Sequence, residues 1–216
     1  MTVPKIDVVC IVATLLPDFG IGCQGGLPWK LSKEMKYFRQ VTSGTINSNK
    51  CNAVIMGRKT WESIPMKFRP LPSRYNVVIS RSYDSLLTSE KLNNDDGKEF
   101  YKINSLEEGI KQLKSKMGDS LERIYIIGGG QIYSNSYSLS DKLLITKLDI
   151  ESSDIERPEM DTFLNIKQIQ DEFKDISNGL KEYLPTTVTL PEPTVNNEYI
   201  EREKGYKFQY TLYEKK

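Results

Sequence analysis

Hydrophobic residues along the chain are gathered in short runs, separated by polar stretches rich in glycine, proline and asparagine. The first run, residues 8–16, is continuous rather than alternating, which is typical of a strand covered on both faces. Shorter runs at 53–56, 76–79, 100–103, 123–127 and 142–146 predict further strands. Residues 206–213 alternate polar and aromatic side chains, which predicts an antiparallel strand at or near a sheet edge.

The clearest helical pattern begins at Leu31, because Leu31, Met35, Phe38 and Thr42 are spaced to form one stripe along a helix. We expect that stripe to face the core. Glu34 falls within it, and a buried carboxylate needs a partner because desolvating a lone charge is costly. Two interpretations stay open: a core ion pair, or a bound ligand whose N–H and NH₂ groups hydrogen-bond to the carboxylate.

Three shorter helices are predicted between the strands. One begins with a capping box formed by Ser105 and Glu108. Another opens at Gly57 and ends before Pro65, because proline cannot continue a helix. A third starts near Gln131, after a glycine turn.

Strands alternating with helices predict an α/β fold with a mostly parallel, twisted central sheet. We expect about eight strands, an antiparallel C-terminal strand, and helices on both faces. No linker divides the chain, so residues 1–216 are expected to form a single domain. Residues 83–98 are predicted to form a polar loop with its tip at 93–97, and residues 151–197 show no clear period.

The composition limits the kinds of active site and metal site that the chain can form. The 216 residues include no histidine, which excludes histidine-based nucleophilic catalysis and histidine metal ligands. Cys10, Cys23 and Cys51 are scattered, so free thiols in a reducing compartment are expected rather than a zinc site or disulfides. The net charge of +1 gives no support for nucleic-acid binding. With no signal peptide or transmembrane run in the sequence, we expect a cytoplasmic protein.

Three strand ends carry groups that suit anions. Residues 57–60 place two cations and a hydroxyl at a helix start, residues 80–82 place an arginine between two serines, and residues 128–130 are all glycine. Each has an ordinary structural alternative: a solvated basic turn, a capped surface loop and a tight turn. Because ligands bind beyond the carboxyl ends of parallel strands, the three together suggest a dinucleotide with an extra phosphate, NADP rather than NAD.

Two further residues precede the third strand. Arg74 is either a bidentate clamp for a carboxylate or a surface arginine. The Arg69–Pro70 bond is a candidate cis peptide.

With these residues laid out, the chain resembles the dihydrofolate reductase family of the eukaryotic, fungal, monofunctional type. The order and spacing of the motifs agree across nearly the whole chain. The resemblance also implies an adenosine-binding sub-lobe around 53–117 and a cis bond between Gly128 and Gly129. It is carried by residues 11–13, 20–22, 27–29, Glu34, Phe38, 56–65, 68–72, Arg74, 80–82, 126–129, 132–133, Thr146, 160–163 and the aromatic C-terminal strand.

The resemblance implies roles for individual residues. Glu34 and Thr146 would form the catalytic hydrogen-bond network around the pteridine, and Arg74 would bind the glutamate-tail carboxylate. The substrate would contact Ile11, Val12, Leu27, Glu34, Met35, Phe38, Arg39, Ile64, Leu71, Arg74, Ile127, Tyr133 and Thr146. NADPH would contact Ala13, Gly20, Ile21, Gly22, Cys23, Gln24, Gly25, Gly26, Gly57, Arg58, Lys59, Thr60, Ser80, Arg81, Ser82, Gly128, Gly129, Gly130, Gln131, Ile132 and Tyr133.

The implied function is NADPH-dependent reduction of 7,8-dihydrofolate to tetrahydrofolate, which supplies one-carbon metabolism, by a monomer that is also an antifolate target. No metal is expected. Two alternatives remain: a reductase of another heterocycle, such as a pyrimidine of riboflavin synthesis, and a non-catalytic folate- or NADP-binding module. The chain departs from the family at Gly130, where many relatives have alanine or serine, and at Met35, where vertebrate relatives have an aromatic residue.

Overall fold

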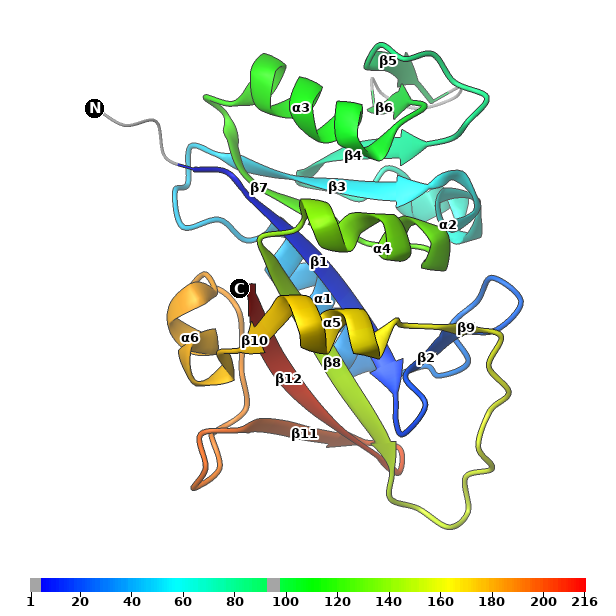
Figure 1. The fold of residues 1–216 in the computed structure, drawn as a ribbon, viewed down its shortest axis with the longest axis vertical. Coiled ribbons are helices and arrows are strands. Elements are labelled where there is room, and N and C mark those ends of the chain that lie inside the picture. The colour runs from blue at the N-terminus through cyan, green and yellow to red at the C-terminus, as the bar shows by residue number, and fades with distance from the viewer. Residues whose placement is uncertain (1–4, 93–97) are drawn as a thin grey trace.

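The computed structural model describes residues 5–92 and 98–216. The predicted loop tip at 93–97 lies outside the described residues. The elements, shown in Figure 1, are β1 (Asp7–Leu15), β2 (Gly20–Gly22), α1 (Ser32–Ser43), β3 (Cys51–Gly57), α2 (Arg58–Ser63), η1 (Met66–Phe68), β4 (Arg74–Ile79), β5 (Thr88–Lys91), β6 (Glu99–Ile103), α3 (Leu106–Met117), β7 (Leu121–Ile126), α4 (Gly130–Ser136), η2 (Tyr137–Leu139), β8 (Lys142–Ile150), β9 (Thr162–Phe163), α5 (Ile166–Glu172), β10 (Phe173–Asp175), η3 (Ser177–Gly179), α6 (Leu180–Tyr183), β11 (Tyr199–Glu203) and β12 (Tyr206–Lys215).

The strands in the described part of the chain form one mixed sheet of 12 strands, with the main order β10-β12-β8-β1-β7-β3-β4-β6-β5. Its centre, from β8 to β6, is parallel, whereas β12 runs antiparallel to β8. The predicted α/β architecture and the near-edge C-terminal strand are therefore confirmed. The strands beyond the predicted eight are short pieces at the periphery, such as the fully exposed β5, and carry little hydrophobic signal.

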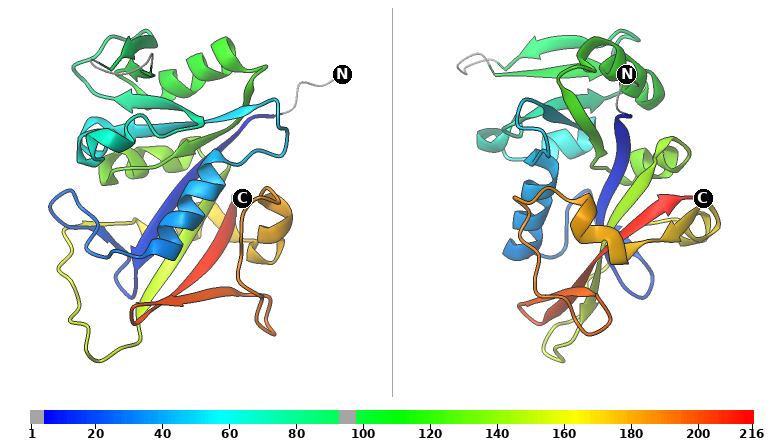
Figure 2. Two further views of the ribbon diagram at one scale, coloured as in Figure 1. Left: turned by 180° about the vertical axis from the view of Figure 1, so that it is seen from behind. Right: turned by 90° about the vertical axis from the view of Figure 1, so that its left-hand side faces the viewer.

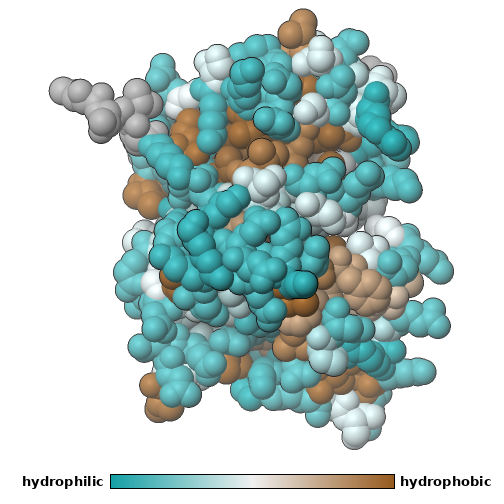
Figure 3. Space-filling model, in the orientation of Figure 1, coloured by the Kyte–Doolittle hydropathy of each residue, from teal (hydrophilic) through white to brown (hydrophobic). Residues whose placement is uncertain are grey.

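Two hydrophobic cores lie on opposite faces of the sheet. In β1, Val8 and Cys10 belong to one core and Val9 and Ile11 to the other, which confirms a strand covered on both faces. Helices α3, α4 and α5 cover the face toward the viewer in Figure 1, and α1 lies behind the sheet, as the reverse view in Figure 2 shows. The space-filling view shows mostly hydrophilic side chains on the front face, with hydrophobic ones visible between α3 and α4 (Figure 3).

The buried stripe of α1 differs in phase from the predicted one. Besides Thr42, the buried residues of the helix are Glu34, Tyr37 and Val41, whereas Met35 is 50% exposed. The predicted stripe included Met35 and left out Tyr37. In the observed stripe the Glu34 carboxylate lies at the centre of the buried face, which makes a buried role for this side chain clearer than the predicted stripe did.

Residues 151–197 contain short elements that the sequence pattern did not predict. The helix α5 begins after Asn165, whose side-chain oxygen accepts a 3.1 Å hydrogen bond from the Gln168 N–H. The strands β9 and β10 have two and three residues, too few to establish a period. Their positions are set by pairing with β2 and β12, which are distant in the sequence.

Two of the three cis peptide bonds in the described residues were predicted. Arg69–Pro70 is cis, and so is Gly128–Gly129, which contains no proline. Leu16–Pro17 is the third. Gly128 has a φ of 107°, a conformation that favours glycine.

Candidate active site

The strand ends that the sequence singled out lie along one edge of the parallel sheet. Ala13 of β1 pairs with Thr146 of β8. Gly57, at the end of β3, pairs with Ile79 of β4, and its N–H donates a 2.8 Å hydrogen bond to the Gly128 carbonyl. The loops after β1, β3, β4 and β7 therefore meet at this edge, where ligands of α/β proteins bind.

Glu34 lies in the first turn of α1 and is only 6% exposed. Within residues 5–92 and 98–216, its carboxylate has no hydrogen-bond or ion-pair partner. The core ion pair that the sequence left open is therefore not formed there. Burial raises the pKa of Glu34 to about 7, since removing the carboxylate from water favours its neutral form. A buried carboxyl group of this kind can release its proton when a cationic or N–H-rich ligand compensates the charge.

Thr146 is buried on the same face of the sheet as α1, since its neighbours Leu144 and Leu148 belong to the core that α1 covers. It lies between Ala13 of β1 and Tyr210 of β12. In the described chain, no hydrogen bond joins the Thr146 hydroxyl to Glu34. The expected network between these two side chains is therefore not formed by the protein alone.

Aromatic side chains surround Glu34. The Tyr37 ring stacks on Tyr210 with centroids 3.9 Å apart, which ties α1 to β12. Burial raises the pKa of Tyr210 and of Tyr133, and the nearby Glu34 charge raises both further. These phenols therefore remain neutral at physiological pH.

The apolar residues expected around the substrate differ in burial. Phe38, Ile64 and Leu71 pack, partly buried, against the core that contains Ile11. Leu27 is 51% exposed and Met35 is similarly exposed. These two side chains are not held in the core, so they are available to cover a ligand.

Arg74, at the start of β4, is half-buried and turned toward α1. Its Nη1 donates a 2.6 Å hydrogen bond to Thr42 Oγ1, and its Nε donates to the Pro72 carbonyl at 3.0 Å. Burial and the neighbouring Arg39 charge lower the pKa of Arg74 to about 10. Two cations side by side, with no carboxylate paired to Arg74 in the described residues, suit an anionic ligand group.

The loop after β3 offers cations and a hydroxyl. Arg58 pairs with Glu62 at 2.9 Å, whereas Lys59 is exposed and has no ion-pair partner among the residues described. Thr60 Oγ1 would lie 3.2 Å from a β-carbon on Gly129. The backbone of the β7–α4 turn therefore approaches α2 closely at Gly129.

The loop after β4 presents an exposed arginine between two serines. Ser80 Oγ and Ser82 Oγ are 2.9 Å apart, and Arg81 is exposed between them. Arg81 makes no hydrogen bond or ion pair to another described residue. Because β4 is the direct neighbour of β3, Arg81 and Lys59 extend from adjacent strand ends.

Tyr133 links the β7–α4 turn to β1. Its hydroxyl donates a 2.9 Å hydrogen bond to the Ile11 carbonyl. A β-carbon on Gly128 would lie 2.9 Å from the Tyr133 ring. Ile132 packs against the core with its Cγ1 3.2 Å from where a Gly57 β-carbon would be, while Gln131 is exposed and faces solvent.

The glycine-rich loop after β1, residues 20–26, pairs and hydrogen-bonds with the segment before α5. Gly20 and Gly22 of β2 pair with Phe163 and Thr162 of β9. Asp161 Oδ2 accepts a 2.6 Å hydrogen bond from the Gln24 N–H, and these contacts lower the pKa of Asp161. The resemblance placed residues 160–163 in the family without assigning Asp161 a role, and its distance of 137 residues from Gln24 leaves no local signal.

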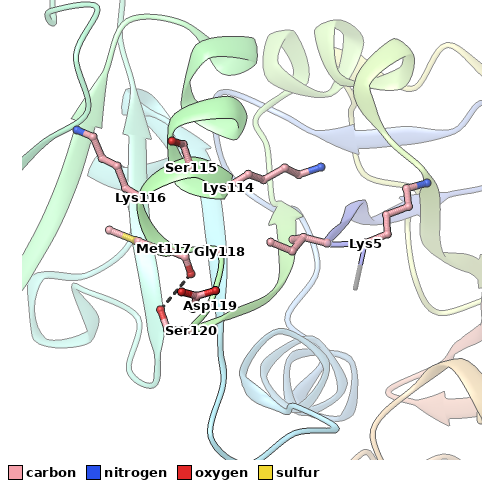
Figure 4. A pocket seen from close by; sticks show the side chains of 9 residues that line it. Lys5, Lys114, Ser115, Lys116, Met117, Gly118, Asp119 and Ser120 are labelled. Carbon is pink, nitrogen blue, oxygen red and sulfur yellow. Dashed lines mark hydrogen bonds between the residues drawn. The ribbon is translucent and has the colours of Figure 1, made fainter. Parts of the chain in front are cut away.

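A second hollow lies away from these strand ends. This pocket is at the opposite edge of the sheet, before β1 and β7, where Lys114 extends from the end of α3 and Lys5 from the segment before β1 (Figure 4). Lys5 is already paired with Asp141 at 2.6 Å. Across the described ranges, no group of three or more acidic or cysteine side chains could hold a metal ion, and no helix is long and apolar enough to cross a membrane.

Comparisons with known proteins agree with this geometry. The sequence pattern of the dihydrofolate reductase family matches residues 7–185. The chain is 50% identical over 213 residues to a dihydrofolate reductase of Saccharomyces cerevisiae, covering 98% of both chains. It is 39% identical over 214 residues to a dihydrofolate reductase of Candida albicans, covering 98% of this chain and 99% of that one.

A bifunctional dihydrofolate reductase–thymidylate synthase of Glycine max is 36% identical over 156 residues, which make up 71% of this chain but only 27% of that protein. The two fungal proteins, by contrast, are matched over nearly their whole length. The unpartnered carboxylate on α1, the meeting of the strand-end loops and these matches lead to one conclusion: the chain belongs to the dihydrofolate reductase family.

Proposed function

We propose that the protein catalyses the reduction of 7,8-dihydrofolate by NADPH and a proton, giving 5,6,7,8-tetrahydrofolate and NADP⁺. The observation that carries the proposal is Glu34, a carboxyl group buried on α1 without a protein partner in the described chain. Such a group is costly to ionise unless a ligand satisfies it. A pteridine offers an amino group and a ring N–H side by side, which suit the two oxygens of a carboxylate.

Glu34 anchors the pteridine and favours its protonated form. The raised pKa means that Glu34 itself holds a proton in a large share of molecules near neutral pH. A ligand that arrives with a positive charge draws this proton off, since the opposite charge stabilises the carboxylate. Thr146 of β8 hydrogen-bonds to the pteridine that Glu34 binds. The side chains of Leu27, Met35 and Phe38 exclude water from this ligand.

Arg74 binds the α-carboxylate of the glutamate tail. The bond from Nη1 to Thr42 leaves the second terminal nitrogen of the guanidinium free for the ligand. Arg39 adds a second positive charge nearby. Glu34 and Arg74 together orient the substrate, because Glu34 binds the pteridine at one end and Arg74 binds the tail at the other.

The residues at the strand ends fit NADPH, which supplies the hydride when it is bound. Lys59 and Thr60 would hold the pyrophosphate, and the lack of side chains at Gly128 and Gly129 would permit close approach of the backbone to it. Ser80, Arg81 and Ser82 hold the 2′-phosphate. Ala13 and the loop from Gly20 to Gly26 enclose the nicotinamide side.

We further propose that the chain acts as a single-domain, cytoplasmic monomer in which residues 53–117 form the adenosine-binding part. Dihydrofolate and antifolate inhibitors would be its small-molecule ligands. Support comes from the fungal relatives, which the chain matches over nearly their whole length.

A spectrophotometric assay tests the proposed function. Purified protein is mixed with dihydrofolate and either NADPH or NADH, and absorbance at the reduced-nicotinamide band is followed. We expect dihydrofolate-dependent loss that is much faster with NADPH. No loss with either cofactor, in protein shown to be folded by circular dichroism, would contradict the proposal. Equal rates would retain the reaction and remove the 2′-phosphate assignment.

A further inference from the structure

The helix that carries Glu34 lacks a local N-cap. The residue at its N-cap position is Leu31, which has no side-chain hydrogen-bond acceptor, and α1 starts directly after it at Ser32. The first N–H groups of a helix have no partner within the helix and are usually capped by a nearby polar side chain. In α1 the cap comes from the other end of the sequence.

Glu203, the last residue of β11, provides this cap. Its Oε1 accepts a 2.9 Å hydrogen bond from the Ser32 N–H, and its Oε2 accepts a 2.8 Å bond from the Lys33 N–H. The partners are 171 and 170 residues apart in the chain. Burial acts to raise the pKa of Glu203, but the two N–H groups lower it overall, so the carboxylate stays ionised at neutral pH.

Neighbouring contacts join the same two segments. Lys33 Nζ forms a 2.7 Å ion pair with Glu201 and a 3.1 Å hydrogen bond to the Arg202 carbonyl. Lys204 Nζ donates a 2.9 Å hydrogen bond to the Lys30 carbonyl. The β11–β12 hairpin therefore grips the start of α1, and the reverse view shows the hairpin lying across the lower end of the sheet below α1 (Figure 2).

The hairpin also forms the opposite side of the Glu34 site. Tyr210 of β12 pairs with Tyr199 of β11 and with Thr146 of β8, and its ring stacks on Tyr37 of α1. Glu203 thus fixes the first turn of α1 to the hairpin that also carries Tyr210. Glu34 on α1 and Thr146 on β8 are therefore both joined to this hairpin.

We propose that Glu203 is a positioning residue for Glu34: by capping Ser32 and Lys33 it holds the first turn of α1 against the β11–β12 hairpin and leaves the Glu34 side chain free for the ligand. This inference rests on the proposed function of Glu34. A glutamate three residues into a helix often folds back to cap the helix start. Such a glutamate binds the N–H of the N-cap residue, here Leu31, whereas Glu203 binds the next two N–H groups, those of Ser32 and Lys33. In the described chain Glu34 makes no capping bond of its own, and the hairpin caps the helix start in its place.

The cap also has an electrostatic consequence. Free N–H groups and the helix dipole stabilise a negative charge at the start of a helix. Glu203 compensates that positive end, so Glu34 gains less from it. The titratable side chains that face Glu34 are Tyr37 on its own helix, Tyr133 on α4 and Tyr210 on β12, and burial keeps all three protonated near neutral pH.

The groups around Glu203 are Lys204, which lowers its pKa, and Lys33 and Glu201, which pair with each other. Of these, the Glu203 charge alone is bound directly to the helix N–H groups. Replacing Glu203 by glutamine keeps an oxygen that can accept one N–H bond but removes the charge. The positive electrostatic potential at the helix start is then less compensated, so it stabilises the Glu34 carboxylate more strongly.

Carbon-13 NMR of protein labelled at the glutamate carboxyl carbon tests the proposal directly, without substrate. The Glu34 resonance is identified by its loss in Glu34→Gln, and its titration is compared in wild type, Glu203→Gln and Glu201→Gln. We expect the Glu34 pKa to fall by about 0.2–0.7 unit in Glu203→Gln. Glu201→Gln removes the same charge from the same hairpin without releasing the helix N–H groups, and we expect its Glu34 titration to match that of the wild type.

Steady-state kinetics provide a second measurement. In Glu203→Gln we expect a higher KM for dihydrofolate, an unchanged KM for NADPH, and a shift of the pH profile of kcat/KM in the direction of the NMR titration. Urea unfolding confirms that the variant is folded. Identical Glu34 titrations in all three proteins would overturn the inference even if dihydrofolate is reduced. A shifted titration without turnover would support the inference and overturn the proposed function.

Discussion

Thr42 Oγ1 accepts a 2.6 Å hydrogen bond from Nη1 of Arg74 and donates a 2.8 Å bond to the Phe38 carbonyl. A buried threonine of α1 thus fixes the orientation of the arginine at the start of β4. The second terminal nitrogen of the guanidinium is left for a ligand. This relationship gives Arg74 a defined geometry that a surface arginine would lack.

Arg74→Lys should weaken substrate binding. Lysine retains the charge but loses the fork geometry, so it cannot hold Thr42 and a carboxylate together. We expect KM for dihydrofolate to rise about 10- to 100-fold, as for loss of a charge-assisted hydrogen bond, with a small change in kcat. A dihydropterin without the glutamate tail serves as the control, and its kinetics should be the same in both proteins. Equal losses for the two substrates would contradict a role for Arg74 at the tail.

Glu34→Gln should stabilise the protein without ligand at alkaline pH. Below the ordinary glutamate pKa of 4.5, Glu34 is protonated in both folded and unfolded chains and imposes no penalty. Between 4.5 and about 7 the unfolded chain ionises while the folded one keeps its proton, so stability falls as pH rises. Above pH 7 the penalty is constant, about 3 kcal/mol from the difference between these pKa values.

Urea unfolding of wild type and Glu34→Gln at pH 4, 6 and 8 checks this expectation. The two proteins should have similar stability at pH 4, and the variant should be the more stable at pH 8. Since the same substitution removes the pteridine anchor, turnover near neutral pH should fall sharply. A stability difference that is constant with pH would show that Glu34 does not have a raised pKa.

Much of the fold could be predicted because its signals are local. Each central strand is a hydrophobic run, and Ser105 caps its helix as predicted by accepting a bond from the Glu108 N–H. The return bond from the Ser105 N–H to the Glu108 carboxylate, which would complete the capping box, is not formed among the described residues; Glu108 pairs with Lys111. The burial of Glu34 also followed from helical spacing, although the stripe was centred on Met35 rather than Tyr37.

The parts that were not predicted depend on contacts between distant residues. β2 and β9 are held by pairing with each other, and the caps on α1 and on the Gln24 N–H come from Glu203 and Asp161. A single carboxylate in a polar stretch gives no sign of which N–H it will bind 130 or more residues away. Glu34, Arg74 and the three anion-binding strand ends were singled out from the sequence pattern, whereas the other site residues came from the family resemblance. The roles of all these residues stay predictions.

Gly130→Ala should destabilise the turn between β7 and α4. An added β-carbon would collide with Thr162 Cγ2, so Thr162 would have to move, and β9 with it. We expect a loss of about 1–3 kcal/mol, typical of overpacking. The glycine at position 130 is thus matched to the threonine beside it.

Thr162→Ser removes the colliding methyl group and keeps the hydroxyl that donates to Asp161 at 2.8 Å. The double variant Gly130→Ala, Thr162→Ser should therefore recover most of the lost stability. Urea unfolding of the single and double variants measures this coupling. Additive losses would mean that the contact with Thr162 does not limit residue 130.

Asp161→Ala should loosen the glycine-rich loop, because Asp161 binds the Gln24 N–H in that loop. We expect weaker NADPH binding, measured by quenching of tryptophan fluorescence, and faster cleavage of the loop by a protease. Glu159→Gln, a change at an exposed carboxylate in the same segment, is the matched control and should leave both unchanged. Wild-type affinity in Asp161→Ala would mean that this contact does not hold the loop for the cofactor.

Arg81→Ala should reduce the preference for NADPH over NADH. The two cofactors differ only in the 2′-phosphate, and Arg81 is the exposed cation between Ser80 and Ser82 at the end of β4. We expect kcat/KM for NADPH to fall about 10- to 100-fold, as for loss of a charge-assisted bond, while that for NADH is nearly unchanged.

Lys59→Ala provides the contrast, since a residue at the pyrophosphate acts on a group that both cofactors share. We expect it to lower kcat/KM for NADPH and NADH by similar factors. Raising the salt concentration should weaken NADPH binding more steeply in wild type than in Arg81→Ala, because screening acts on the exposed charge that the variant lacks. If Arg81→Ala instead lowered the efficiency with both cofactors equally, the 2′-phosphate would have to be bound elsewhere on this edge of the sheet.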